Sequence, residues 1–219
     1  GYLTKAPNLR NSFSNSRENN NTVENLTSEK VLSADASYIY RGAFLQAKLT
    51  GYYTKVQDAT EISFYFADGI GGDNTAFVQE VLNGVDKKHL GVELGLEAQV
   101  TPTIKLKGAA SIGQFTYDNN PNLLLTSSDF TDGLNFGEAN LKDYKIAGGP
   151  QRAASIGFEY RDPNYWWFGT TANFMSNAYV DVSPLTRTEN FYLDTDGLPF
   201  PDYDPTLAKE LLRQEKFDS

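Results

Sequence analysis

The feature that most constrains this fold is an unbroken two-residue alternation between His89 and Val100. After His89, odd positions carry glycine, glutamate or glutamine, and even positions carry the apolar side chains Leu90, Val92, Leu94, Leu96, Ala98 and Val100. Successive side chains of a β-strand point to opposite faces, whereas a helix repeats about every 3.6 residues. This segment is therefore predicted to be a strand with one apolar and one polar face.

The same alternation predicts three hairpins with tight turns. After Val100, the Thr101-Pro102-Thr103 turn interrupts the pattern, because proline cannot donate to the ladder. The paired segments are 32–40 with 45–53, 90–100 with 104–112, and 154–160 with 165–179, and their turns lie near 41–42, 101–103 and 161–164. With a further short strand near Tyr2, the expected fold class is all-β: an antiparallel up-and-down sheet of about six or seven strands.

Long connections separate these hairpins. They cover about 57–87, 118–150 and 177–219, whereas connections in compact soluble domains are usually about 4–6 residues long. Short helices are expected inside them, one from Asn74 to Gly84 and another beginning at Asp204-Pro205. Short turns at one end and long loops at the other are typical of a transmembrane β-barrel of the outer-membrane type.

Strand length and aromatic placement favour that barrel over a soluble sandwich. The eleven residues 90–100, at about 3.3 Å each and tilted by about 40°, rise roughly 28 Å, close to the ~25 Å apolar band of such barrels. Aromatic rings suited to lipid headgroup level flank two turns: Tyr38, Tyr40 and Phe44 at one, and Tyr160, Tyr165, Trp166, Trp167 and Phe168 at the other. A sandwich would bury the same apolar face against a second sheet, and periodicity alone leaves both architectures open.

Composition excludes several functions. The chain has no cysteine and a single histidine, which excludes a thiolate or multi-histidine metal site, and its formal charge of -9 argues against nucleic-acid binding. No run of 18 apolar residues is present, so no transmembrane helix is expected. Asp194-Thr195-Asp196-Gly197 has its glycine at the fourth position, not the sixth of an EF-hand, and is interpreted as a turn, with a calcium site left open. We predict no metal site and no cofactor.

Three segments resemble TonB-dependent outer-membrane receptors. Tyr2 to Leu9 (Y-L-T-K-A-P-N-L) is similar to the family's R-A-P-N-L segment, with Lys5 in place of arginine. Asn25 to Glu29 followed by Asp35-Ala36 is similar to N-L-x-x-E…E-x-G, where the family has glutamate and glycine at the last two positions. Leu82 to Glu93 (L-N-G-V-D-K-K-H-L-G-V-E) resembles the family's N-x-G-x-x-x-x-x-G-V-E entry into a strand. Their order matches that of the family.

The resemblance implies a plugged outer-membrane barrel of about 22 strands that imports a scarce nutrient with energy from the TonB complex. The nutrient would be a siderophore, vitamin, glycan or peptide. Because no plug, TonB-contacting segment or aromatic-ended final strand is recognised, residues 1–219 are expected to form part of one barrel domain. The turns would be periplasmic and the long loops extracellular. The implied partners are the nutrient, outer-membrane lipid, the TonB complex through the plug, and a surface lipoprotein as an optional accessory.

Aromatic residues in the predicted outer loops are the candidate ligand contacts. Phe64-Tyr65-Phe66 places three consecutive rings in the loop 57–87, where they can stack on a sugar, a siderophore or another hydrophobic ligand. Packing of these rings against the expected loop helix is the equally weighted alternative. Tyr117 and Phe130, near the next loop, are further candidates of the same kind.

Four charged residues on the polar face are predicted to line the lumen. Glu93 and Glu97 are roughly 13 Å apart by strand rise, beyond the ~5–9.5 Å that separates glycosidase carboxylates, so no catalytic residue is predicted. Lys105 and Lys107 lie on the next strand, and cross-strand ion pairing is the expected role. The favoured function is nutrient import without catalysis. A secreted β-sandwich carbohydrate-binding module is the alternative.

Overall fold

A computed structural model describes residues 1–13, 20–67, 76–127, 130–193 and 198–217. Within them, strand pairing is antiparallel throughout, in the order β1-β2-β3-β4-β5-β8-β9-β10, with β6 paired to β4 and β7. The strands are β1 (Tyr2–Lys5), β2 (Glu29–Arg41), β3 (Leu45–Ala67), β4 (Ala76–Gln99), β5 (Ile104–Tyr117), β6 (Asn122–Ser127), β7 (Phe130–Glu138), β8 (Pro150–Arg161), β9 (Trp167–Tyr179) and β10 (Lys216–Phe217). The helices are η1 (Leu9–Asn11), η2 (Leu185–Arg187), η3 (Glu189–Tyr192) and α1 (Pro205–Leu211). The expected all-β, up-and-down class is confirmed.

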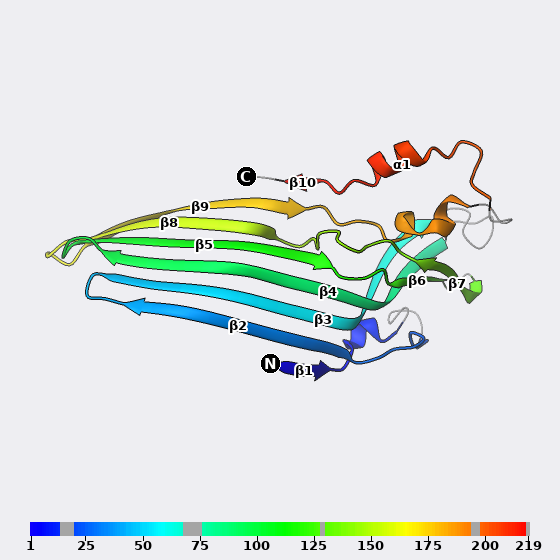
Figure 1. The fold of residues 1–219 in the computed structure, drawn as a ribbon, viewed down its shortest axis with the longest axis horizontal. Helices are drawn as coiled ribbons and strands as arrows, with labels where there is room; N and C mark the ends of the chain where they lie inside the picture. The colour runs from blue at the N-terminus through cyan, green and yellow to red at the C-terminus, as the bar shows by residue number, and fades with distance from the viewer. Residues whose placement is uncertain (14–19, 68–75, 128–129, 194–197, 218–219) are drawn as a thin grey trace.

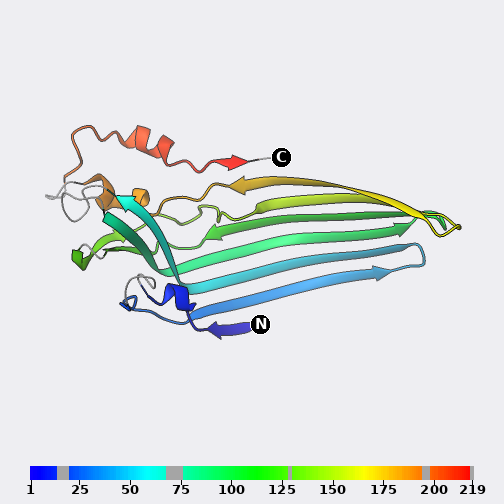
Figure 2. The ribbon, with the colours of Figure 1, turned by 180° about the vertical axis from the view of Figure 1, so that it is seen from behind.

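The sheet is a long, curved wall with two different ends (Figures 1 and 2). At the turn end, short connections at 42–44, 100–103 and 162–166 join β2 to β3, β4 to β5, and β8 to β9. At the opposite, loop end, the long connections gather with α1 and the short helices (Figure 1). Strands β1 and β10 form the two edges of the sheet path, so the wall is open and not a closed barrel.

The strand register gives this wall two chemically different faces. The side that we call the outer face carries apolar rows, for example Leu49, Leu94, Ala110, Ala154 and Phe174 across five neighbouring strands. The side that we call the inner face carries the adjacent row of Thr50, Glu93 and Ser111. Side chains alternate in this way because the strands of the main wall keep the period of two that the sequence shows.

The apolar outer face has no second layer over it in the part of the chain that the structure describes. Val92 is 50%, Ile112 60% and Ile156 67% exposed, and all the described strands belong to one sheet. A β-sandwich requires a second sheet over this face. The sandwich interpretation is therefore wrong for this chain.

Strands β3 and β4 extend beyond the main wall at the loop end. The helix expected from Asn74 to Gly84 is wrong, since residues 76–84 belong to β4; Asn74 itself lies outside the described residues. Two β-bulges, with positive φ at Asp58 (59°) and Gly84 (69°), shift the pairing here. Val78 and Val81 are both buried although they point to opposite faces of β4. Because both faces are buried, apolar residues occur three and four positions apart, as they would in an amphipathic helix.

The hydrophobic core lies at the loop end, where the sequence predicted long loops with short helices and no core. Hairpin β6–β7 folds within the expected loop 118–150 and pairs with the β4 extension. The core consists of Ala59, Val78, Leu82, Val85, Tyr117, Leu123, Leu125, Ala139, Leu141 and Leu185. Its side chains come from the four strands β3, β4, β5 and β6 and from two connections, the one after β7 and the one that contains η2, so the long connections form a packed cap.

Helix α1 begins as the sequence predicted. The Asp204 carboxylate accepts hydrogen bonds from the backbone N–H groups of Thr206 (2.8 Å) and Leu207 (3.3 Å), which satisfies two of the free donors of the first turn. The segment after α1 is tied to the cap, because the Tyr144 hydroxyl donates to the Leu212 carbonyl at 3.0 Å. Among the described residues, no helix combines the length and apolar content needed to cross a membrane.

Candidate functional site

A cleft of about 980 Å³ opens at the loop end. We call it the loop-end cleft. It lies between the β3–β4 extension, η1 and the segment 181–184, and its charged and tyrosine lining comprises Arg10, Glu61, Tyr65, Glu80, Lys87, Tyr117 and Asp181. Helix η1 is held against β3 by the Asn11 side-chain amide, which donates to the Thr60 carbonyl at 2.7 Å. Segments distant in sequence therefore meet around one opening.

Tyr117, a predicted ligand residue, is part of a charged cluster on the cleft wall. Its hydroxyl donates to the Glu61 carboxylate at 3.4 Å, and the same carboxylate pairs with Lys87. The Lys87 ammonium also lies 5.5 Å from the centroid of the Tyr117 ring, within the range of a cation–π contact. Burial, reinforced by the Glu61 charge, raises the pKa of Tyr117, so its phenol remains a proton donor at neutral pH.

Tyr65, the second predicted residue at the cleft, has an unused hydrogen-bond donor. Burial raises the pKa of Tyr65 to about 12, with a smaller contribution from the Glu80 charge. Its buried hydroxyl has no hydrogen-bond partner within the part of the chain that the structure describes. Glu80, by contrast, accepts from Ser63 at 2.7 Å and from the Leu185 N–H at 3.2 Å. Tyr65 thus carries a donor without a described partner, and because that hydroxyl is shielded from solvent, a ligand reaches it only when neighbouring groups move.

The other predicted aromatics are placed differently. Phe64 borders the cleft, but its ring stacks on Phe77 with centroids 5.6 Å apart, and Phe66 packs on the same ring at 5.0 Å while remaining 73% exposed. Alternation along β3 sends these two rings to the face opposite Tyr65. The expected packing against Phe77 therefore exists, on a strand instead of a helix. Phe130 begins β7, and its side chain lies outside the description.

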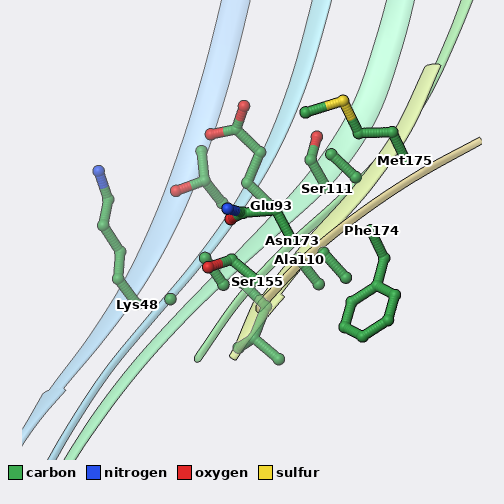
Figure 3. A pocket seen from close by; sticks show the side chains of 14 residues that line it. Lys48, Glu93, Ala110, Ser111, Ser155, Asn173, Phe174 and Met175 are labelled. Carbon is green, nitrogen blue, oxygen red and sulfur yellow. The ribbon is translucent and has the colours of Figure 1, made fainter. Parts of the chain in front are cut away.

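A second hollow, of about 370 Å³, lies on the inner face in the middle of the wall. Figure 3 shows Lys48, Glu93, Ser155 and Asn173 around it, with the Phe174 ring pointing away. Small residues make the hollow, because a side chain added at Gly95 would meet no atom within 4 Å. Polar groups on one side and Phe174 on the other repeat the division of the sheet into two faces.

The predicted lumen residues form cross-strand ion pairs nearer the turn end. Lys105 pairs with Glu97 of β4 at 2.8 Å, and Lys107 pairs with Glu159 of β8 at 2.9 Å. Glu93 borders the inner hollow, and no described cation pairs with it. Across the described ranges, no three His, Cys, Asp or Glu side chains are grouped so as to hold a metal ion. The run 194–197 lies outside those ranges.

Comparison with known proteins agrees with this geometry. The family model described as "TonB dependent receptor-like, beta-barrel" matches residues 2–205. The chain belongs to this receptor family. The resemblance noted in the first hundred residues is therefore confirmed over most of the chain, and the family places such barrels in the outer membrane. No curated protein matches the chain.

One of the solved structures that match is described as "Copper transporter OprC". The two are 23% identical with a TM-score of 0.53, and the match covers 80% of this chain but only 23% of that one. At this identity the likeness shows the fold. The chain spans about a quarter of the length of that transporter.

Five charged cleft residues of this receptor chain were missed by the sequence reasoning: Arg10, Glu61, Glu80, Lys87 and Asp181. Glu61 and Lys87 flank the two bulges, where the alternation is broken, so no face could be assigned to them from sequence. Asp181 follows β9 and reaches the cleft only through the fold. The sequence held one signal that could have placed Glu61 on a strand. Glu61-Ile62-Ser63, just before the aromatic run, alternates polar and apolar side chains as a β-strand does.

Proposed function

We propose that this chain forms part of the wall and part of the ligand-binding mouth of a TonB-dependent outer-membrane importer. The observation that carries the proposal is the loop-end cleft, which brings Tyr65 and Tyr117 together with Glu61 and Lys87 above a wall with an apolar outer face. In this arrangement the outer face contacts lipid, the inner face lines a hydrated lumen, the loop end is extracellular and the turn end is periplasmic.

The cleft binds its ligand through phenol groups and charged oxygens. Tyr117 and the Glu61–Lys87 pair offer donors and acceptors on one wall. Tyr65 lines the cleft with a hydroxyl that lacks a partner, and a ligand acceptor would relieve the cost of that buried donor. No bond is made or broken in this role, so the chain acts as a receptor and not as an enzyme. The energy for import comes from the TonB complex through a plug, and a surface lipoprotein is an optional partner.

The chemistry of the cleft favours an organic cargo of the siderophore, vitamin, glycan or peptide class. Copper, named for OprC, is bound best by sulfur and imidazole ligands. This chain has no cysteine, and its one methionine, Met175, borders the inner hollow. His89 packs against Phe115 in a tilted arrangement, with ring centroids 5.0 Å apart, and does not line the cleft. Oxygen and aromatic groups instead suit a polar organic molecule.

Uptake by cells that carry the full-length receptor tests this function. The probes are a labelled iron(III)–siderophore, cobalamin, a malto-oligosaccharide and an oligopeptide, each measured with and without a protonophore. We expect one class to accumulate, and the protonophore to abolish its accumulation. Tyr117→Ala should lower uptake at limiting probe concentration, whereas the control Phe66→Leu, on the opposite face of β3, should not. Accumulation that is insensitive to the protonophore and to Tyr117→Ala would contradict the proposal.

A further inference from the structure

An arginine on the apolar outer face has no ion-pair partner among the described residues. The register places Arg152 of β8 between Ile112 of β5 and Ser176 of β9, in a row that continues through the exposed Val92. The Arg152 side chain is exposed, and no carboxylate in the described part of the chain pairs with it. A cation on a lipid-facing surface therefore needs a partner from outside the chain.

The height of Arg152 corresponds to the outer boundary of the membrane. It lies nine residues above Arg161, the last residue of β8 at the turn end. At about 3.3 Å per residue and a tilt of about 40°, this is a rise of roughly 23 Å, against an apolar band of ~25 Å. Charged side chains on the lipid face are costly at the midplane and tolerated near the interface, where phosphate groups are found.

A groove of about 740 Å³ runs over the outer face beside this arginine. Ala34, Ala36 and Gly51 are among its small residues, and larger apolar residues, Gln114 and Arg152 also line it. Asp35 is in the lining as well, but the register places it opposite Tyr52, in the rows of the inner face. An apolar groove with a cation and an amide in its lining has the chemistry to hold an acyl chain together with an anionic headgroup.

Two more cations lie on the same face, toward the loop end. Lys55 and Lys88 are direct cross-strand partners, and Asp118 bridges them at 2.8 and 3.2 Å. Asp86, two residues before Lys88 on the same strand face, adds a second carboxylate that acts on Lys55. These two lysines are therefore compensated by carboxylates of the chain itself, which leaves Arg152 as the cation beside the groove.

We propose that this outer face binds a phosphate-bearing lipid of the outer leaflet, with the phosphate on Arg152 and an acyl chain in the groove. The proposal rests on the proposed function, since the outer face must contact membrane lipid. Gln114, which lines the same groove, donates a further hydrogen bond to the headgroup. The wall is then an anchoring site for one lipid molecule as well as a lipid-facing surface.

The test is native mass spectrometry of the delipidated full-length receptor titrated with two lipids that differ only in phosphate, dioleoyl phosphatidate and dioleoylglycerol. The wild type should bind phosphatidate more tightly, and Arg152→Gln should weaken that binding about fivefold, the effect expected of one basic side chain at an anionic surface. Lys48→Gln, which removes a charge from the inner face, should leave it unchanged. Gly51→Leu, where a side chain meets no atom within 4 Å, should fill the groove and weaken both lipids.

Two outcomes would overturn the lipid proposal. The first is that Arg152→Gln and Lys48→Gln weaken phosphatidate binding equally. The second is that inorganic phosphate competes fully with phosphatidate while Gly51→Leu binds phosphatidate as tightly as the wild type. This second result would indicate an ion site without an acyl chain. Nutrient uptake separates this proposal from the proposed function. If uptake of a probe persists while lipid selectivity is absent, the lipid site alone is refuted, whereas a receptor without uptake or membrane insertion refutes the function first.

Discussion

Replacing Tyr65 by phenylalanine should make the protein more stable and a poorer receptor at the same time. In the free protein the buried hydroxyl has no partner among the described residues. A buried donor left unpaired costs about 1–3 kcal/mol, so its removal should stabilise the loop end by up to about that amount. A hydrogen bond formed with the ligand contributes about 0.5–1.5 kcal/mol net, so affinity should fall about two- to twelvefold.

Tyr144→Phe is the matched control for this variant. The Tyr144 hydroxyl is also partly buried, but it already donates to the Leu212 carbonyl at 3.0 Å and does not line the cleft. Its loss should destabilise the loop end by about 1 kcal/mol and leave affinity unchanged. Stability is read from hydrogen exchange of β3, β4 and β6, and affinity from titration with the probe that the receptor imports. Equal destabilisation by both variants would refute the reasoning, because it would mean that the Tyr65 hydroxyl is paired.

Three further predictions concern stability. First, the loop end should lose stability between about pH 10 and 12, because the phenol of Tyr65 ionises near its ordinary pKa of 10.0 in the unfolded chain but only at about 12 in the folded chain. This loss should be smaller in Tyr65→Phe. The same pH profile of stability in the wild type and in Tyr65→Phe would contradict the prediction. Second, Leu123→Ala, at a fully buried core position, should lower the free energy of unfolding of the loop end by about 2–5 kcal/mol. Hydrogen exchange should then increase in β6–β7 but not at the turn end. An equal increase in exchange along the whole wall would show that the cap does not unfold separately. A double-mutant cycle of Glu97→Gln and Lys105→Gln should give a coupling of only about 0.2–1 kcal/mol, since the Glu97 side chain is 41% exposed, and a larger value would imply a dry lumen.

The main wall could be predicted from the sequence because its strands alternate without interruption. The segment 90–100 shows one apolar and one polar face, and its structure has that division. Tight turns were marked by local chemistry, as at Asp162, whose carboxylate accepts the Asn164 N–H at 2.9 Å. Helix α1 was predictable for the same reason, since Asp204 is a local cap.

The cap and the cleft could not be predicted, because long-range pairing and not local periodicity forms them. The bulges at Asp58 and Gly84 break the alternation of β3 and β4, and burial of both faces of β4 near Val78 removes the polar half of the pattern. Tyr65 and Tyr117 were chosen as aromatics in loops, yet what brings them together is the pairing of β3 with β4 and of β4 with β5. Their partners Glu61 and Lys87 carried no comparable signal.

The apolar face should contact lipid and the opposite face water, and the accessibility of each face to lipid-soluble and water-soluble reagents can be measured directly. The chain has no cysteine, so single cysteines at positions 92 to 97 of the reconstituted receptor can each carry a nitroxide spin label. Labels at Val92, Leu94 and Leu96 should collide mainly with dissolved oxygen, and labels at Glu93, Gly95 and Glu97 mainly with a water-soluble nickel chelate. Accessibility without this two-residue alternation, or with its phase reversed, would contradict the account.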